Sequence, residues 1–315
     1  MQQVRTAVIG VGYLGRFHAQ KYAALPGADL VAVVDANEEN RTKVAAETGC
    51  RAVADFRDIL GEVDAVSIAT PTPLHYPIAQ ECLDRGLHVL VEKPITTTLE
   101  EARSLIETAA RRGRVLQVGH LERFNAAILA LAGTLRTPRF VESHRLTPFK
   151  ERGTDVNVVL DLMIHDIDLI QSLVGAPIES IDAVGSSVFS AGLDIANARI
   201  RYANGCVANT TASRVSMKME RKLRLFQDDA YISIDLQQKI LTIVRKPPPG
   251  AEVPTGQVLI EERTYDQGDA LLHEIEAFLH SVRTGTPPVV SGEDGLRALE
   301  TATRITQMVQ DGAQS

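Results

Sequence analysis

The chain has 315 residues, of which 33 are basic and 40 acidic, and its net charge is −7. This length is typical of two domains, and 44% hydrophobic residues can form buried cores, which excludes wholesale disorder. Only 4% of the residues are aromatic, none is tryptophan and no basic block occurs, so the composition argues against a nucleic-acid-binding protein.

Cysteine use and hydropathy indicate the compartment. Cys50, Cys82 and Cys206 form no CxxC pattern, so we expect reduced, unligated thiols in a cytoplasmic protein. The apolar N-terminal run is short, is interrupted by glycines and continues into Arg16 and His18, which does not fit a signal peptide. No run reaches the roughly 20 apolar residues of a membrane helix. We therefore expect a soluble protein that has no membrane partner.

The first 121 residues alternate between strand-like and helix-like segments. Strand-like segments are 6–9, 30–34, 63–69, 89–91 and 115–118, and helix-like segments are 14–24, 38–47, 77–85 and 99–112. Thr98 and Glu101 have the spacing of a capping box at the start of the last helix. Continuously apolar strands are typical of a parallel sheet covered on both faces. We predict an α/β, doubly wound Rossmann domain over residues 1–121.

The pattern changes in residues 122–315, which we predict to be a second, α+β domain. Its expected elements are a helix at 124–131, a strand at 140–146, a helix at 156–174, mostly strands from 178 to 244, and helices at 270–282 and 296–309. Turn signals lie at Asn204-Gly205 and Asp228-Asp229, and a proline-rich loop spans 247–250. Consecutive strands predict a large, mainly antiparallel or mixed, open sheet with helices on one side.

A glycine pattern, GxGxxG, occupies Gly10, Gly12 and Gly15 between the first strand and the first helix. The glycines permit a tight turn, close approach of a pyrophosphate and close helix packing. The helix start, at Tyr13 and Leu14, offers N–H groups and a partial positive charge to the phosphates. A purely structural glycine turn is the alternative, but the flanking strand and helix favour a dinucleotide site.

Asp35 follows Gly15 by 20 residues and ends the next strand. Its carboxylate can accept hydrogen bonds from the ribose hydroxyls and repels a 2′-phosphate. Ala36 and Asn37 come next, so no adjacent arginine is placed to bind that phosphate, although Arg41 lies one helical turn further on. The pattern favours NAD over NADP.

Two further segments end strands at the ligand-binding edge of the predicted parallel sheet. Glu92-Lys93-Pro94 places a lysine where it can reach over a nicotinamide towards a substrate hydroxyl, although a lone lysine is usually a solvated surface residue. Thr70 and Pro71, with His75, end the neighbouring strand and can shape the nicotinamide side of the pocket. A rigid loop is the alternative interpretation of these residues.

The predicted helix 156–174 carries a polar stripe that contains Asp161, His165 and Asp168. Asp161 and His165 are one turn apart, so the carboxylate can orient the imidazole and stabilise its charge. The alternative interpretation is a polar helix face that is simply exposed to solvent. Metal binding is a less well supported alternative, because no third histidine or cysteine is suitably spaced.

Taken together, these motifs resemble the Gfo/Idh/MocA oxidoreductases over nearly the whole chain. The resemblance rests on the glycine pattern, Asp35, Thr70-Pro71 with His75, Glu92-Lys93-Pro94, Arg123-Phe124-Asn125, the Asp161/His165 pair and the closing segment 292–300. It implies a nicotinamide cofactor, catalytic roles for Lys93, Asp161 and His165, and a second-domain sheet that forms a homodimer or homotetramer. Val158-Val159 and Ala126 depart from the family pattern, which bears on substrate-side geometry.

Within the family, the segments 156–170 and 120–125 look most like the members that act on UDP-N-acetylglucosamine in lipid A precursor pathways. This resemblance implies a nucleotide sugar oxidised at its 3-hydroxyl. It also implies that Lys93, Arg123, Asn125, Arg145, Asp161 and His165 bind substrate. Arg139, Arg145, Lys150 and Arg152 can meet a diphosphate or be ordinary surface charge.

The resulting hypothesis is NAD-dependent oxidation of a secondary alcohol on a sugar. His165 takes the hydroxyl proton, Lys93 stabilises the developing alkoxide and Asp161 orients the imidazole. A free sugar, polyol or inositol is the alternative substrate class. A non-catalytic NAD-binding sensor or scaffold is the alternative of another kind, which the presence of all three polar residues disfavours.

Overall fold

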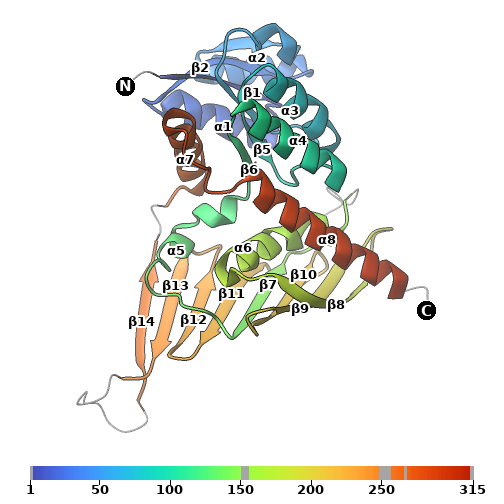
Figure 1. Cartoon of the computed structure of the whole chain (residues 1–315), viewed down its shortest axis with the longest axis vertical. Coiled ribbons are helices and arrows are strands. Elements are labelled where there is room, and N and C mark those ends of the chain that lie inside the picture. Colours follow the sequence, from blue (N-terminus) through green and yellow to red (C-terminus); the bar gives the residue numbers. More distant parts are fainter. Residues whose placement is uncertain (1–2, 150–155, 248–256, 266–267, 313–315) are drawn as a thin grey trace. The chain divides into compact units, whose positions relative to one another are not determined.

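The computed structural model describes residues 3–149, 156–247, 257–265 and 268–312. The chain divides into two compact units, Met1–Leu121 with Ala270–Leu299 and Glu122–Asp269 with Glu300–Ser315 (Figure 1). Residues 270–299, which the sequence analysis placed in the second domain, thus pack with the first unit. Part of the predicted proline-rich loop, residues 248–250, lies outside the described residues.

The first unit contains a six-stranded parallel sheet in the order β3-β2-β1-β4-β5-β6. Its strands are β1 (Val4–Ile9), β2 (Ala28–Val34), β3 (Arg51–Val53), β4 (Ala65–Ile68), β5 (His88–Glu92) and β6 (Leu116–Gly119). This order confirms the predicted Rossmann fold, in which ligands bind at the carboxyl ends of strands where the order reverses. Strand β3 was not predicted, because it is only three residues long and lacks an apolar run.

Helices cover both faces of this sheet. They are α1 (Tyr13–Ala24), α2 (Glu38–Thr48), α3 (His75–Asp84), α4 (Leu99–Arg112) and α7 (Ala270–Thr284). Helix α1 contacts α2 and α7, whereas α3 contacts α4. The predicted capping box is confirmed: the Thr98 side chain accepts the Glu101 N–H, and the Glu101 carboxylate accepts the Thr98 N–H.

Helix α7 belongs to the first unit because of its apolar face. Four of its side chains are buried and join the core that includes Tyr22 of α1 and Leu90 of β5. These four are Leu271, Ile275, Phe278 and Leu279. Their three- and four-residue spacing puts them on one side of the helix. Helical spacing predicts that α7 has an apolar face but does not identify the sheet it covers.

The second unit contains an eight-stranded mixed sheet in the order β14-β13-β12-β11-β7-β10-β9-β8. Its strands are β7 (Phe140–Leu146), β8 (Ile178–Ser186), β9 (Ile195–Tyr202), β10 (Val207–Ser213), β11 (Glu220–Gln227), β12 (Ala230–Asp235), β13 (Ile240–Arg245) and β14 (Leu259–Thr264). Only the β7–β10 pair is parallel among these described strands. The sheet therefore confirms the predicted mixed, mainly antiparallel class.

Helices lie against one face of this sheet. Helix α6 (Ile164–Val174) contacts β7 and β10, and the short α5 (Ala126–Leu129) contacts β12 (Figure 1). The long helix α8 (Gly292–Gly312) contributes residues 292–299 to the first unit and its remaining residues to the second. Compared with the predictions, α5 is shorter than the helix expected at 124–131, and α8 is longer than the helix expected at 296–309.

In the described part of the chain, no helix has both the length and the apolar character needed to span a bilayer.

Candidate active site

The three glycines of the GxGxxG pattern, two before α1 and Gly15 in its first turn, have different physical reasons to be glycine. Gly10 has a φ of +83°, and a Cβ there would lie 2.8 Å from the Thr70 backbone nitrogen. A Cβ at Gly15 would lie 1.8 Å from the Gly10 carbonyl oxygen. A Cβ at Gly12, in contrast, would meet no heavy atom within 4 Å. Gly10 and Gly15 are therefore required by packing, whereas Gly12 leaves open space in front of the helix.

Helix α1 begins at this open space. Its N-cap, Gly12, has no side chain with which to cap the helix. The first N–H groups of a helix have no intrahelical acceptor and carry a partial positive charge, so Tyr13 and Leu14 present donors to an anion. The Tyr13 ring is 72% exposed and packs edge-to-face on Phe17, with centroids 5.4 Å apart. The loop fits a pyrophosphate, as predicted for a dinucleotide.

Asp35 lies at the carboxyl end of β2, beside the glycine loop. Its Oδ2 accepts the Val11 N–H at 2.9 Å, and its Oδ1 accepts the Asn37 N–H at 2.8 Å. These bonds fix the carboxylate at the rim of a cavity of about 340 Å³ that is also lined by Gly10, Thr70, Pro71 and Phe56. In this position the Asp35 carboxylate can accept hydrogen bonds from the two hydroxyls of a ribose.

Arg41 is the nearest basic residue that follows Asp35 in the sequence. Its guanidinium donates to the Ala36 carbonyl at 3.0 Å and lies 3.7 Å from the Glu38 carboxylate. Arg41 is thus held on its own loop and helix. Arg57, which also lines the cavity, is paired with Asp55 and Glu81. The Asp35 carboxylate at this cavity fits a ribose without a 2′-phosphate.

His75 joins two loops at the carboxyl edge of the sheet. Its Nδ1 lies 2.8 Å from the Pro94 carbonyl oxygen, and its Nε2 lies 2.8 Å from the Thr70 carbonyl oxygen. The ring is buried, which lowers the pKa of His75, whereas the two carbonyl oxygens act in the opposite direction and favour the protonated ring. The carbonyl oxygens come from two different loops. His75 therefore lies between the loop after β4, with Thr70 and Pro71, and the loop after β5.

The Glu92-Lys93-Pro94 segment follows β5 at the same edge of the sheet. Glu92 is 8% exposed, and its side chain points into the interior, where Oε1 lies 3.1 Å from His18 Nε2. Lys93 is half-buried and immediately follows the end of the strand. The carboxyl ends of β1, β2, β4 and β5 meet at one edge because these strands are parallel. Within the first unit, Lys93 and the glycine loop therefore share the ligand-binding edge.

The second unit holds the Asp161/His165 pair. Residues Val159–Met163 form a π-helical turn that leads into α6, so the predicted single α-helix over 156–174 is wrong in its first turn. The Asn157 side chain opens this turn by accepting the N–H groups of Val159 and Leu160, each at 3.0 Å. Asp161 lies in the π turn and His165 in the first turn of α6, and both are half-buried. π-Helical turns are frequent at functional sites.

Two arginines predicted to bind substrate are paired within the second unit. Arg123 grips Asp168 with two hydrogen bonds, of 2.8 and 2.6 Å, and Asp168 is 1% exposed. Arg145 is 2% exposed and donates to both oxygens of Asp166, at 3.0 and 2.9 Å, and to Glu122 at 2.9 Å. Bidentate pairs of this kind fix orientation. The two arginines therefore anchor α6, which carries Asp166 and Asp168.

The other predicted substrate residues differ in their surroundings. Asn125 is 5% exposed, donates to the Leu236 carbonyl at 2.9 Å and caps α5 through the Ala127 N–H. Arg139 is exposed and pairs with Asp228 at 3.1 Å. Lys150 and Arg152 lie outside the described residues.

Asp194, which no sequence motif predicts, supports the turn before α6. Its carboxylate is fully buried and accepts the backbone N–H groups of Val188, Phe189 and Ser190 at 2.6–2.9 Å. Burial alone raises the pKa of Asp194, but the hydrogen bonds outweigh it and hold that pKa well below its ordinary value. The adjacent Leu193 carbonyl accepts the Val158 N–H at 3.0 Å. No spacing rule connects Asp194 to residue 158, so local sequence patterns give no signal for it.

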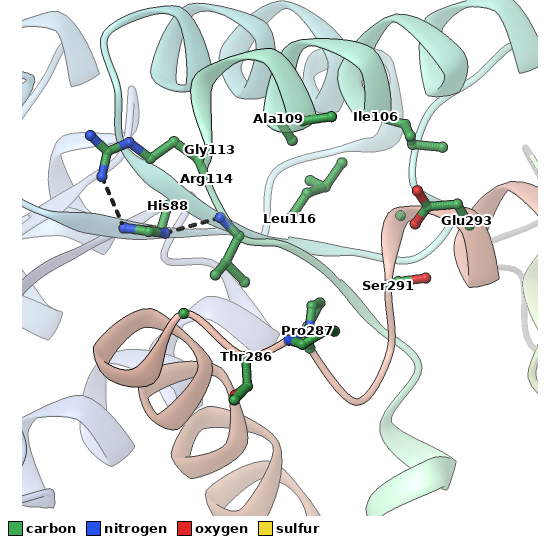
Figure 2. Close-up of a pocket in the computed structure, with 15 residues that line it drawn as sticks. His88, Ile106, Ala109, Gly113, Arg114, Leu116, Thr286, Pro287, Ser291 and Glu293 are labelled. Atoms are coloured by element: carbon green, nitrogen blue, oxygen red, sulfur yellow. Dashed lines mark hydrogen bonds between the residues drawn. The ribbon is translucent and has the colours of Figure 1, made fainter.

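A separate cavity of about 330 Å³ lies at the opposite, amino edge of the first unit's sheet. Figure 2 shows His88, Arg114 and Leu116 on one side of it and Thr286, Pro287 and Ser291 on the other. The Val115 N–H donates to His88 Nδ1 at 3.0 Å, and burial and Arg114 lower the pKa of His88 to about 4. None of the predicted site residues lines this cavity.

This fold, with an open glycine turn, an acidic group at the ribose position and a lysine on the same strand edge, defines a nicotinamide-dinucleotide-binding oxidoreductase. Residues 4–120 match the model of an oxidoreductase family described as an NAD-binding Rossmann fold, and residues 139–314 match its C-terminal alpha/beta domain. The chain therefore belongs to the Gfo/Idh/MocA oxidoreductase family, and its cofactor is NAD.

Three similar proteins place the chain within this family. A UDP-N-acetylglucosamine 3-dehydrogenase from Acidithiobacillus ferrooxidans is 42% identical over 98% of both chains. Its solved structure superposes with a TM-score of 0.92, at 41% identity over 100% of both chains. A scyllo-inositol 2-dehydrogenase (NAD(+)) from Bacillus subtilis is 28% identical over 98% of this chain and 95% of its own. A levoglucosan dehydrogenase in complex with NADH has the same fold, with a TM-score of 0.86 at 20% identity over 98% of both chains.

Proposed function

We propose that this enzyme oxidises the 3-hydroxyl of UDP-N-acetylglucosamine to a ketone with NAD as the hydride acceptor. The observation that carries the proposal is the 42% identity to a UDP-N-acetylglucosamine 3-dehydrogenase over 98% of both chains. The inositol 2-dehydrogenase from Bacillus subtilis has 28% identity, which gives less support to an inositol substrate.

Within this proposal, His165 and Lys93 act on the same hydroxyl. His165 accepts the hydroxyl proton, because an imidazole exchanges protons readily near pH 7. The Lys93 ammonium donates a hydrogen bond to the oxygen and stabilises its developing negative charge. Asp161 orients the imidazole and favours its protonated form. Bound NAD supplies the acceptor for the hydride that leaves the carbon, so the alcohol loses one hydride and one proton.

The residues at the strand edge of the first unit are assigned to the cofactor. The open space at Gly12 and the N–H groups of Tyr13 and Leu14 receive the pyrophosphate. Asp35 accepts the ribose hydroxyls. Thr70 and Pro71, whose loop contacts His75, line the same cavity as Asp35 and are assigned to the wall of the cofactor site.

In this proposal, Arg123 and Arg145 support the substrate helix and do not bind the sugar nucleotide directly. Arg145 is buried and bonded to Asp166, and Arg123 is bonded to Asp168, so both act through the position of α6, which carries His165. Asn125 is buried as well, and it acts through α5 and the Leu236 carbonyl.

A substrate panel tests the proposal. Purified enzyme is incubated with NAD and either UDP-N-acetylglucosamine, UDP-glucose or myo-inositol, and NADH absorbance is followed with hydroxylamine present to trap the ketone. We expect NADH formation with UDP-N-acetylglucosamine and a sugar product lighter by two hydrogens before trapping. NADH formation with myo-inositol alone would establish the alternative substrate class.

We also propose that the chain forms a homodimer or homotetramer through the second unit's sheet. In support, Phe140, Phe226 and Tyr231 form a half-buried ring cluster on neighbouring strands, with successive centroids 5.5 and 5.0 Å apart. Light scattering of the purified chain measures the mass directly, and a monomer at micromolar concentration would contradict this proposal.

A further inference from the structure

Three titratable side chains meet in the interior of the first unit, beneath the lysine loop. They are His18 from α1, Glu92 from the end of β5 and Glu274 from α7. One nitrogen or oxygen atom from each lies within 4.8 Å of those of the other two. Their exposed fractions are 1%, 8% and 0%. Neither the family motifs nor the proposed mechanism gives His18 or Glu274 a role.

Glu92 connects this cluster to Lys93. Its Oε1 lies 3.1 Å from His18 Nε2, and its Oε2 accepts the Lys93 backbone N–H at 3.3 Å. A Cβ at Gly119 would lie 2.9 Å from the Glu92 carboxyl carbon, so the glycine on β6 leaves the space that the carboxyl group occupies. The position of this carboxyl group is therefore coupled to the start of the Lys93 loop.

Glu274 is the unusual member of the cluster. It is completely buried, and neither of its carboxyl oxygens has a hydrogen-bond partner among the described residues. An ionised carboxylate in such a place is strongly unfavourable, and a second one at Glu92 would add repulsion. Burial raises the pKa of Glu274 well above its ordinary value, and the charge on Glu92 raises it further. Protonation of Glu274 removes both the cost of burying its charge and the repulsion from Glu92.

Among the described residues of this cluster, the group that could offer a positive charge is His18, and its Nε2 faces Glu92 at 3.1 Å. Two further neighbours from the sheet and from α1 are neutral. Tyr22 of α1 is buried, and its hydroxyl pairs with Ser67 of β4 at 2.8 Å. Gln117 of β6 donates its amide to the backbone carbonyl of Glu274 at 3.1 Å, not to the carboxyl group. The Glu92 carboxylate, one oxygen of which lies within 4.8 Å of a Glu274 oxygen, is thus the charged acceptor in this cluster for a proton carried by Glu274.

We propose that Glu274 is a positioning residue that holds a proton towards the Glu92 carboxylate and thereby fixes the loop that carries Lys93. The inference rests on the proposed function only in that it takes Lys93 as catalytic. Helix α7, which carries the proton-bearing group, is part of residues 270–299. The packing of these residues with the first unit therefore has a functional consequence in this proposal. His18 acts from the other side and sets the orientation of Glu92.

Two substitutions and a matched control test this proposal. Glu274→Gln keeps the shape and a hydrogen-bond donor, whereas Glu274→Leu removes the donor. Glu276→Gln, an exposed glutamate on the same helix, is the control. We expect the infrared difference spectrum between wild type and Glu274→Gln at pH 7 to contain the carbonyl stretch of a protonated carboxylic acid. The Glu276→Gln difference spectrum should lack this band.

Hydrogen exchange and kinetics test the positioning. In Glu274→Leu, the peptide that spans residues 92–97 should exchange its amides faster, and kcat should fall roughly 10- to 100-fold with KM for NAD nearly unchanged. Glu274→Gln should leave both close to wild type. The infrared and exchange measurements need no substrate, so they remain decisive if the proposed substrate is wrong.

Three results would overturn the inference. The first is the absence of an acid band from the Glu274→Gln difference spectrum, which would place a carboxylate at residue 274. The second is one equivalent of tightly bound metal in wild-type enzyme that Glu274→Gln loses, measured by elemental analysis. The third is exchange in residues 92–97 that is unchanged in a folded Glu274→Leu, or equally fast in Glu274→Gln.

Discussion

Two alanine substitutions in the glycine loop, Gly12→Ala and Gly15→Ala, should affect NAD binding and protein stability to different extents. An added Cβ at Gly15 would lie 1.8 Å from the Gly10 carbonyl oxygen, which is backbone and cannot swing away. Overpacking of this severity costs about 3 kcal/mol or more. At Gly12 the added Cβ meets nothing within 4 Å, although the backbone angles of φ −66° and ψ −148° are not ones that alanine favours. We expect Gly12→Ala to lower the free energy of unfolding by about 1 kcal/mol, clearly less than Gly15→Ala.

The methyl group of Gly12→Ala nevertheless occupies the space where the pyrophosphate must approach the start of α1. We therefore expect its Kd for NAD to rise at least about tenfold, which corresponds to about 1.4 kcal/mol. Urea denaturation followed by circular dichroism measures the stability of both variants, and calorimetric titration measures NAD binding. Wild-type affinity for NAD in Gly12→Ala would refute the reasoning, as would equal loss of stability in both variants.

Three further predictions concern catalysis, cofactor choice and stability. His165→Ala and Lys93→Met should each lower kcat by roughly 10²- to 10⁴-fold in steady-state assays, because each removes a group that acts on the transferred proton or the developing charge. Asp35→Ser should weaken NAD binding and narrow the ratio of the Kd values for NADP and NAD, since the charge that repels a 2′-phosphate is gone. Asp194→Asn should lower the free energy of unfolding by about 2 kcal/mol at pH 7, through loss of charge-assisted hydrogen bonds. Because folding lowers the pKa of Asp194, its contribution is present above the unfolded pKa of about 3.9 and is lost as the pH falls towards the folded value.

Matched variants control these experiments. His280→Ala changes an exposed histidine of α7 and should leave kcat unchanged. Asp182→Asn changes an exposed aspartate of β8 and should leave stability unchanged at every pH. Near-normal turnover in both His165→Ala and Lys93→Met would disprove the assigned chemistry. A difference between Asp194→Asn and wild type that does not shrink in acid would disprove the account of Asp194.

Local patterns predicted those parts of the fold that depend on neighbouring residues. The strands of the first sheet are apolar runs, the capping box depends on a three-residue spacing, and the glycine pattern marks the turn into α1. Strand β3 escaped prediction because three residues with an exposed Arg51 carry no periodicity. The association of 270–299 with the first unit depends on contacts such as that between Gln117 and Glu274, which are 157 positions apart, and local sequence patterns do not predict such contacts.

In the candidate site, too, local patterns predicted some features, whereas others depend on contacts between distant residues. Glycine spacing and strand ends indicated the cofactor loop, and the four-residue spacing indicated the pair of Asp161 and His165. The π-helical turn was not predictable from 3.6-residue periodicity, because it changes that periodicity. Glu274 looks like one charged residue on an amphipathic helix until the fold places it beside Glu92. The partner of Arg145, Asp166, likewise becomes evident only when β7 and α6 are in place.

Transfer of a hydride from carbon 3 of the sugar is the central claim, and isotopic labelling tests it most directly. UDP-N-acetylglucosamine deuterated at carbon 3 is incubated with enzyme and NAD, and the NADH formed is analysed by mass spectrometry. Our account predicts NADH that carries one deuterium, and unlabelled NADH from substrate deuterated at carbon 4. Unlabelled NADH from the carbon-3 substrate, or no NADH from any UDP-sugar, would contradict it.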